Sequence, residues 1–285
     1  MTPIHSIDSL RANLRPYWQM GRSIGFVPTM GALHAGHLSL VERAVPENQL
    51  TVASVFVNPA QFGPGEDLES YPRRLAEDAR ALYAAGVDVV FAPDANTIYP
   101  PDAELILRMP KLGAVGDGVS RPQFFHGITL VVAKLFNLVR PTRAYFGEKD
   151  FQQLFIIRKM ARELFLEVEV IGCPIVREAD GLAMSSRNEY LSAIEREQAT
   201  ILYKTLTFLQ RMVAKGKINN TAAARELVRD RFSTIPNLHL DYFEVRDKHT
   251  FAPVEQLAPS RELRMLIAAN LGRTRLIDNM DVFPA

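Results

Sequence analysis

The chain has 285 residues, enough for one large domain or two ordinary ones. Apolar residues make up 47% and charged residues 23%, the usual balance for a globular protein. The net charge of +1 argues against a general electrostatic affinity for nucleic acid or for an anionic membrane. Any site for an anionic ligand therefore needs a local concentration of donors.

The sequence carries further negative signals. Its single cysteine, Cys173, excludes an internal disulfide framework and fits a reducing cytosol. That residue sits in the apolar run "VEVIGCPIV", which favours a buried thiol over a nucleophile. No signal peptide is visible, and no apolar run approaches the ~20 residues that a membrane helix requires. We therefore expect a soluble cytoplasmic protein with no membrane and no nucleic acid among its partners.

The first residues predict a helix with a defect. Ile7, Leu10, Leu14 and Trp18 have helical spacing, but Pro16 lies among them. Because proline removes a backbone donor and clashes with the preceding turn, we expect this helix to kink or end near residue 15.

Strands and helices then alternate along residues 1–175. Short apolar, β-branched runs predict strands at 23–27, 51–57, 87–92, 143–147 and 168–172, and helical spacing predicts helices at 38–45, 72–85, 127–139 and 151–164. Continuously apolar strands separated by helices indicate a parallel sheet covered on both faces. The prediction is an α/β fold, a Rossmann-like parallel sheet domain.

The alternation of predicted strands and helices ends after residue 175. Residues 174–188, "PIVREADGLAMSSRN", read as a hinge. Beyond it, helical patterns at 193–215 and 221–232 and strand patterns at 240–247, 263–270 and 274–279 predict a smaller α+β C-terminal domain over residues 176–285.

"GFVPTMGALHAGHLSL", residues 25–40, stands where the first predicted strand meets its helix. In a doubly wound sheet, ligands bind outside the carboxyl ends of the strands. The glycines allow a close approach and unusual φ values. A helix that starts near His37 would direct free backbone N–H groups at an anion, and His34 and His37, three apart, would project to the same side. The stretch predicts an anion site.

Two other interpretations of this stretch stay open. An isolated H-x-x-H is often a turn with incidental surface histidines. Metal ligation has less support, because the same segment holds no third His, Cys or carboxylate.

In context, H-x-G-H after a first strand resembles the signature of the nucleotidylyltransferase superfamily, whose members bind ATP there. They usually carry a second phosphate-binding loop rich in Lys, Ser and Arg. "MSSRN", residues 184–188, could fill that role, since Ser185 and Ser186 offer hydroxyls and Arg187 offers a planar fork of donors. As a bare string it is also typical of an N-cap and turn.

Polar side chains also end two other predicted strands. "SVFVNPAQF" (54–62) supplies Asn58 and Gln61. "YFGEKDFQQL" (145–154) supplies Gly147, Glu148, Lys149, Asp150, Gln152 and Gln153. Both segments are expected on the ligand side of the sheet. Lys149 can neutralise phosphate charge, and the amides can fix the carboxylate and hydroxyls of a small acid.

Taken in order, the four segments "FVPTMGALHAGHLSL", "VFVNPAQF", "FGEKDFQQL" and "DGLAMSSRNEYLS" resemble the pantothenate synthetase family, the pantoate–β-alanine ligases of coenzyme A biosynthesis. The resemblance implies ATP-dependent condensation of (R)-pantoate with β-alanine through a pantoyl-adenylate, with release of AMP and pyrophosphate. Mg²⁺ would accompany the ATP through its phosphate oxygens, without a protein metal site. Members are typically homodimers.

The resemblance also assigns residues. His37, His34 and Lys149 are the implied catalytic residues, with His37 as proton donor. Asn58, Gln61 and Gln153 are the implied pantoate and β-alanine contacts. The implied ATP site comprises Met30, Gly31, Ala32, Leu33, His34, Ala35, Gly36, His37, Gly147, Glu148, Lys149, Asp150, Val176, Met184, Ser185, Ser186 and Arg187.

One position departs from the family pattern. His126, in "RPQFFHG", stands where the family often has Arg. We expect that this position only covers the site.

Two rival functions remain at this stage. An adenylyl- or cytidylyltransferase would pass a nucleotide to a phosphorylated substrate, and would need more basic groups than Gln61 and Gln153 supply. A non-catalytic RNA-binding relative of the synthetases is disfavoured by the near-neutral charge.

Overall fold

The computed structural model describes residues 2–284. It divides into two compact units, residues 1–175 and residues 176–285, and each has its own hydrophobic core. We call them the first and second units and describe each by itself.

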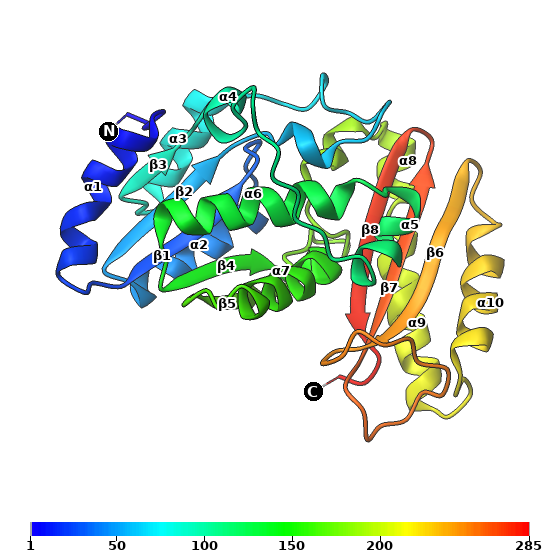
Figure 1. Cartoon of the computed structure of the whole chain (residues 1–285). Helices are drawn as coiled ribbons and strands as arrows, with labels where there is room; N and C mark the ends of the chain where they lie inside the picture. The colour runs from blue at the N-terminus through cyan, green and yellow to red at the C-terminus, as the bar shows by residue number, and fades with distance from the viewer. Residues whose placement is uncertain (1, 285) are drawn as a thin grey trace. The chain divides into compact units, whose positions relative to one another are not determined.

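The first unit is built on a parallel sheet of five strands in the order β3-β2-β1-β4-β5 (Figure 1). The strands are β1 (Ile24–Thr29), β2 (Leu50–Val55), β3 (Val89–Phe91), β4 (Arg143–Gly147) and β5 (Glu169–Cys173). All five predicted strands form, with ends shifted by up to two residues. The Rossmann-like α/β prediction is confirmed.

Alternate residues of each strand face opposite helical layers. Phe26 packs in one core cluster with α1 (Ile7–Gln19), α6 (Phe124–Val139) and α7 (Phe151–Glu163), whereas Val27 packs in another with α2 (Ala35–Glu47) and α3 (Leu75–Ala84). Successive side chains of a strand point to opposite faces, so continuously apolar strands need cover on both sides. Five short helical segments complete this unit: η1 (Pro59–Gln61), α4 (Ala95–Ile98), η2 (Leu112–Ala114), α5 (Asp117–Ser120) and η3 (Glu148–Asp150).

Of the two expectations for the first helix, a kink or an end near residue 15, the end is wrong. Helix α1 continues through Pro16 to Gln19. Leu14 is fully buried beside the last turn, and the Trp18 Nε1–H donates to the carbonyl of Val139 at 3.1 Å. These tertiary contacts outweigh the single backbone hydrogen bond that proline removes.

The second unit contains a three-stranded antiparallel sheet in the order β6-β7-β8. Its strands are β6 (Leu238–Asp247), β7 (Leu263–Leu271) and β8 (Thr274–Asp281), and its helices are η4 (Ser186–Tyr190), α8 (Ala193–Gln198), α9 (Ile201–Ala214) and α10 (Thr221–Phe232). Side chains from α9, α10 and the sheet share one core. The predicted smaller α+β fold is therefore present.

One long helix expected over residues 193–215 is instead two, α8 and α9. The break falls at Ala199 and Thr200. The Thr200 hydroxyl donates to the carbonyl of Glu197 at 2.7 Å. A threonine that bonds locally to the backbone competes with the helical ladder, and periodicity of apolar residues does not report that competition.

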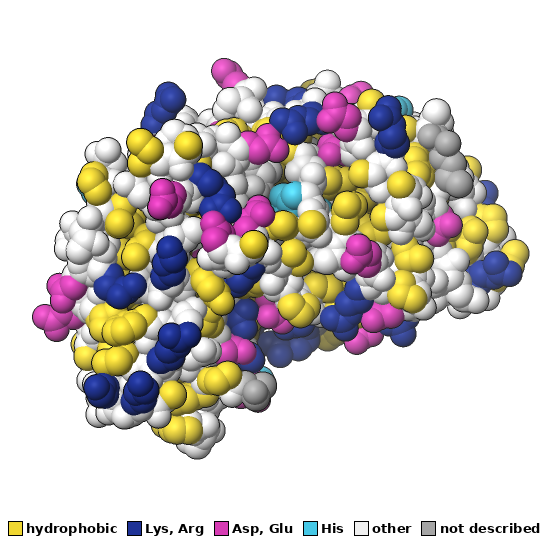
Figure 2. Space-filling model, turned by 180° about the vertical axis from the view of Figure 1, so that it is seen from behind, with side chains coloured by type: hydrophobic (Ala, Val, Ile, Leu, Met, Phe, Trp, Pro, Cys, Tyr) yellow, Lys and Arg dark blue, Asp and Glu magenta, His cyan; other side chains and the backbone are white. Residues whose placement is uncertain are grey.

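The surface is consistent with the near-neutral composition. On the face shown in Figure 2, basic and acidic side chains are both scattered over the molecule. Within residues 2–284, no helix has both the length and the apolar character needed to cross a membrane.

The order of strands in the first unit defines a switch point. Strand β1 lies between β2 and β4, so the connections from β1 and from β4 leave the sheet beside each other at its carboxyl edge. Ligands of open α/β sheets bind at such a point. The residues that follow β1 and β4 are therefore the first candidates for a site.

Candidate active site

The turn after β1 has an unusual backbone. Gly31 and Ala32 both have positive φ, +82° and +50°. Glycine adopts this region readily, but alanine does so at a cost. The buried carboxylate of Asp78, from α3, accepts the N–H of Ala32 at 3.0 Å and the N–H of Leu33 at 2.9 Å. The turn is thus held from another element, and sequence reasoning had not singled out Asp78.

The histidines cap the helix that follows. His34 is the N-cap of α2, and its Nδ1 accepts the N–H of Gly36 at 3.1 Å. In return, the N–H of His34 donates to Nδ1 of His37 at 3.4 Å. The two rings lie 4.1 Å apart between centroids. The predicted projection of both rings to the same side is confirmed.

These bonds correct the expectation of several free backbone N–H groups at the helix start. The helix begins at Ala35, and the N–H groups of Gly36, His37 and Leu38 are bonded within the turn. Among the described residues, only that of Ala35 remains for an external ligand in this first turn. The His34 ring accepts the N–H of Gly36, the capping role that Ser or Asp usually fills, and the His34 carbonyl accepts those of His37 and Leu38.

The same contacts fix the tautomer of both rings. A nitrogen that accepts a backbone N–H carries no proton, so Nδ1 is the acceptor and Nε2 bears the hydrogen in His34 and His37. Burial is the main cause that lowers the pKa of His37 to about 3, and electrostatic interactions with His34 and with the Lys149 ammonium lower it further. Near neutral pH, His37 is therefore an uncharged imidazole with an Nε2–H donor.

Lys149 enters from the neighbouring strand end. It lies in η3 directly after β4, between Glu148 and Asp150, where the chain turns into α7. Its positive charge is close enough to lower the pKa of His37. The switch point thus combines a fixed ammonium with two neutral imidazole donors. Donors of this kind suit the oxygens of a phosphate.

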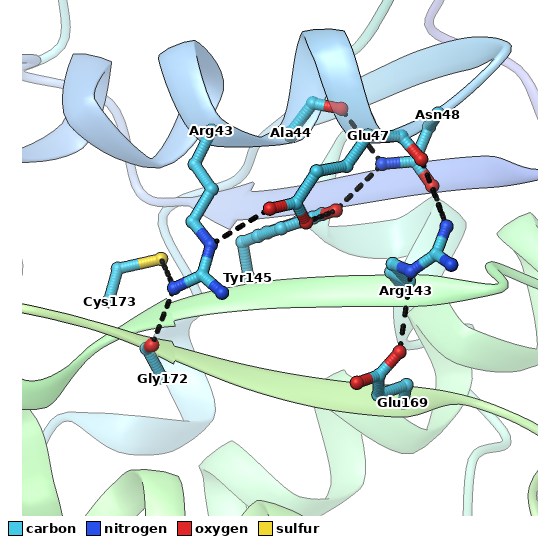
Figure 3. A network of polar contacts seen from close by, with 9 residues as sticks. All are labelled: Arg43, Ala44, Glu47, Asn48, Arg143, Tyr145, Glu169, Gly172 and Cys173. Atoms are coloured by element: carbon cyan, nitrogen blue, oxygen red, sulfur yellow. Dashed lines mark hydrogen bonds and ion pairs between the residues drawn. The ribbon is translucent and has the colours of Figure 1, made fainter.

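Helix α2 is anchored on the sheet by a polar network, shown in Figure 3. The Tyr145 hydroxyl donates to Glu47 at 2.7 Å, and Asn48 donates to the Tyr145 oxygen at 2.7 Å. Arg43 reaches the carbonyl of Gly172 at 3.2 Å. Burial raises the pKa of Tyr145 to about 12, so its hydroxyl stays protonated as a donor. The network ties the histidine-bearing helix to β4 and β5.

The buried Cys173 also lies against this network. Arg43 contacts its sulfur at 4.0 Å, and burial is the main cause that raises the pKa of the thiol. A buried thiol with a raised pKa is a poor nucleophile, in agreement with the sequence-based interpretation.

The two amides after β2, Asn58 and Gln61, are both buried but differ in their contacts. Asn58 is 1% exposed, donates to Gln61 Oε1 and to the carbonyl of Gly127, and accepts from the Tyr99 hydroxyl at 2.8 Å. Gln61 uses its oxygen for Asn58 and directs its NH₂ group towards the sulfur of Met30 at 2.7 Å. Asn58 is therefore a support, and Gln61 presents a donor beside the turn.

The adjacent glutamines after β4 also differ in their contacts. Gln152, 3% exposed, accepts from the N–H of Asp117 and donates to the carbonyls of Leu112 and Val115. The half-buried Gln153 makes no hydrogen bond with its amide among the described residues. Gln153, the one assigned to the site from sequence, has the amide that is open to a ligand.

His126 lies in the first turn of α6. Its Nδ1 atom is buried and has no hydrogen-bond partner among the described residues. Burial and the positive charge of Arg108 lower its pKa. An uncharged ring does not replace a permanent arginine charge, and its role as cover for the site stays a prediction.

The predicted second phosphate segment belongs to the second unit. Val176 and Met184 pair across a short hairpin, with the Met184 N–H donating to the Val176 carbonyl at 3.0 Å. Ser185 caps η4 by accepting the N–H of Arg187 at 3.3 Å. The N-cap interpretation is thus correct for Ser185, and a phosphate role for this segment stays a prediction.

The base of that hairpin is anchored by a residue that sequence reasoning missed. Arg177 forms a bidentate ion pair with the buried Asp278, at 2.7 and 2.9 Å, and also donates to the carbonyl of Gly181 at 3.0 Å. Its guanidinium stacks on Tyr203 at 4.5 Å from the ring centroid. Only the general preference of Arg for planar pairing could have suggested it.

The residues present do not form a metal cage. Within residues 2–284, no group of three or more His, Cys, Asp or Glu side chains is arranged to hold an ion.

The fold and the site together define a class. A Rossmann-like sheet whose first strand leads into a paired H-x-G-H turn is the arrangement of the nucleotidylyltransferase superfamily, as the sequence indicated. The particular family follows from comparison. The model of the pantoate-beta-alanine ligase family matches residues 2–281, and the chain belongs to that family of ligases in pantothenate biosynthesis.

Individual relatives agree. The chain is 47% identical to a pantothenate synthetase of Acetivibrio thermocellus and 48% identical to one of Marinobacter nauticus, in each case over 99% of both chains. It is similar to the crystal structure of pantothenate synthetase from Thermus thermophilus, with a TM-score of 0.92, 44% identity and full coverage of both chains. The pantoate-beta-alanine ligase of Francisella tularensis, solved with β-γ ATP and β-alanine, matches with a TM-score of 0.81 and 32% identity over 99% of this chain and 98% of that one.

Proposed function

We propose that this protein condenses (R)-pantoate with β-alanine in an ATP-dependent, AMP-forming reaction through pantoyl-adenylate. Membership of the ligase family and the ATP and β-alanine complex of the Francisella tularensis relative support the substrates. The observation that supports the two-step route is the switch point, where a lysine lies close to two imidazole N–H donors.

The first half-reaction would activate the acid. A carboxylate oxygen of pantoate attacks the α-phosphorus of ATP, the bond from that phosphorus to its bridging oxygen breaks, and pyrophosphate leaves. Negative charge grows on the phosphate oxygens during this step. The Nε2–H groups of His34 and His37 and the ammonium of Lys149 would stabilise it without reorganising.

His37 has a specific role in this proposal. With a pKa of about 3, the ring is an uncharged imidazole near neutral pH and has no imidazolium proton to transfer. It would therefore donate a hydrogen bond and keep its proton, rather than act as the acid that the family resemblance implied. Its neutrality also avoids a second positive charge next to Lys149.

The second half-reaction would form the amide. The β-alanine nitrogen attacks the acyl carbon, the bond from that carbon to the phosphate oxygen breaks, and AMP leaves. The new amide nitrogen loses a proton to solvent. The NH₂ group of Gln61 and the amide of Gln153 would hold the pantoyl part through both steps.

The remaining assignments complete the proposal. The first unit would bind ATP and pantoate, the second would close over the site, and Met184–Arg187 would contact phosphate with Val176. Mg²⁺ would arrive with ATP, as part of the substrate. The protein would work as a cytoplasmic homodimer.

Isotope exchange between pyrophosphate and ATP tests the two-step route. We expect exchange to require pantoate and Mg²⁺ but not β-alanine, because the adenylate forms before the amine reacts. Exchange that depends on β-alanine would contradict a separate adenylate. Identification of AMP as product separates a ligase from a nucleotidyltransferase, and filter binding at physiological salt tests the RNA-binding alternative.

A further inference from the structure

We propose that Asp78 is a positioning residue, which holds the turn 30–37 in the form that presents the two histidines to phosphate. This inference rests on the proposed function for its meaning, but its structural part can be tested separately. Asp78 itself would not touch the substrate.

The position of the carboxylate carries the argument. Asp78 is 4% exposed, on the inner face of α3, 46 residues away in sequence from Ala32. Its Oδ2 accepts the N–H of Ala32 and its Oδ1 accepts that of Leu33, so each oxygen has one backbone donor. Burial of a carboxylate is costly unless charge-assisted hydrogen bonds compensate for lost water. Among the described residues, those bonds come from the N–H groups of Ala32 and Leu33 in the turn.

The turn needs this support. Ala32 is buried and has a φ of +50°, which an L-residue with a Cβ rarely adopts. Gly31 precedes it with a φ of +82°, and a Cβ at that position would lie 2.7 Å from Asp78 Oδ2. A strained conformation persists only where its surroundings over-determine it. Asp78 both occupies the space beside Gly31 and bonds to the next two residues.

The backbone that Asp78 holds is directly connected to the first of the two histidines. Leu33, held by Asp78, immediately precedes His34, whose ring caps α2 and whose N–H bonds the His37 ring. A change at residues 32 and 33 therefore changes where the capping pair begins. Both oxygens of Asp78 are occupied and buried, which excludes it as a general base in this arrangement.

The test uses Asp78→Asn with Asp88→Asn as its matched control. The control residue also accepts a backbone N–H, that of Thr51 at 2.8 Å, but at the opposite end of the parallel strands. In the Asp78 variant, an NH₂ group must face one of the two backbone donors. We expect pantoate-dependent exchange to fall by up to about 10²-fold, as misplaced catalytic groups produce. Amide formation from supplied pantoyl-adenylate should suffer less.

The imidazole nitrogen spectrum supplies a second measurement. In Asp78→Asn we expect His34 and His37 to lose their single Nε2–H form, and in Asp88→Asn to keep it. Equal slowing of both half-reactions with an unchanged histidine spectrum would reduce Asp78 to a support of the fold. Wild-type exchange and an unchanged spectrum would overturn the proposal outright.

The test remains decisive if Asp78→Asn does not fold or if the proposed function is wrong. If Asp78→Asn does not fold, Asp78→Glu keeps the charge on a longer arm, and it should show the same selective loss; wild-type behaviour of that variant would refute the role. If the wild-type protein shows no pantoate-dependent exchange, the proposed function fails. The histidine spectra of the variants still decide whether Asp78 holds the turn.

Discussion

The two segments assigned to phosphate are held in different ways. The turn 30–37 in the first unit is fixed by a buried carboxylate, Asp78, that bonds directly to the backbone. The hairpin 176–184 in the second unit is fixed by a buried carboxylate, Asp278, that bonds to a side chain, Arg177. In both cases the acid comes from a distant part of the sequence.

The difference separates two kinds of support. Direct bonds to successive N–H groups dictate the backbone of the first turn, including the positive φ of Ala32. A guanidinium at the base of a hairpin anchors the second segment but leaves the backbone of residues 184–187 to its own capping bonds. We therefore expect loss of the first support to change chemistry, and loss of the second to change mainly stability.

The largest expected effect is the loss of stability on removing Arg177, which anchors the hairpin 176–184. Arg177→Ala leaves the buried carboxylate of Asp278 without its ion pair, which typically destabilises by about 3–5 kcal/mol. Arg196→Ala is the matched control, because its partner Asp180 is 44% exposed at the side chain, and such pairs contribute at most about 1 kcal/mol. Denaturant unfolding of both variants measures the difference. Equal losses would show that Arg177 is no more than a surface ion pair.

The next effect tests the chemistry at the first turn. We expect Lys149→Ala and His37→Ala each to slow pantoyl-adenylate formation by ~10²–10³-fold, since each removes a fixed donor from developing charge. Single-turnover kinetics of the two half-reactions should show a smaller effect on amide formation, because pyrophosphate has already left. Lys159→Ala, which removes an ion pair with Glu163 on α7, is the control lysine variant. Near-wild-type adenylation would remove the mutated residue from the catalytic set.

The adjacent residues Gln152 and Gln153, in the first turn of α7, allow the distinction between stability and chemistry to be tested at neighbouring positions. Gln152→Ala leaves one backbone donor and two carbonyls without their partner and should cost about 1–3 kcal/mol of stability. Gln153→Ala should leave stability near wild type and raise the KM for pantoate. Thermal melts measure stability, and substrate titrations measure KM. Loss of stability in Gln153→Ala together with a raised KM for pantoate in Gln152→Ala would contradict the assignment.

Gln61→Ala should raise the KM for pantoate more than the KM for ATP, and substrate titrations measure both. Equal increases would contradict a role in binding pantoate.

The smallest expected effect concerns stability in acid. The pKa of His37 is about 3 in the folded chain and near 6.5 in the unfolded chain. Between pH 3 and pH 6.5, the unfolded chain therefore binds a proton at this residue and the folded chain does not. The stabilising contribution is complete above about pH 6.5 and is lost as pH falls towards 3. Melting temperature should therefore fall more steeply with acid in wild type than in His37→Gln. The exposed His239→Gln serves as control, and parallel curves for wild type and His37→Gln would refute the shift.

Much of the fold was predictable because the spacing of apolar residues along the chain indicates strands and helices directly. Apolar runs gave the strands to within two residues, and the order of motifs gave the family, both of which are confirmed. Two helix boundaries were not predictable in this way. Contacts at Trp18 accompany the continuation of α1 past Pro16, and a local hydroxyl bond at Thr200 accompanies the break between α8 and α9.

The supports of the site were not predictable in the same way. Nothing in the sequence separates Asp78 from other acids on a helix, or Gln152 from Gln153, since their partners lie 35 to 46 residues away. The sequence also cannot show that the ring and the carbonyl of His34, rather than a ligand, accept the N–H groups of Gly36, His37 and Leu38. The roles of the site residues themselves stay predictions.

The central claim is that the turn 30–37, which we propose to bind phosphate, is already formed in the free protein, with neutral histidines that present Nε2–H. Nitrogen-detected NMR of the imidazole rings, assigned with His34→Gln and His37→Gln, tests it most directly. The structure predicts one Nε2–H tautomer for each ring near neutral pH and no titration of His37 from about pH 8 down to about pH 4. A proton on Nδ1 of either ring, or titration of His37 near pH 6.5, would contradict the claim.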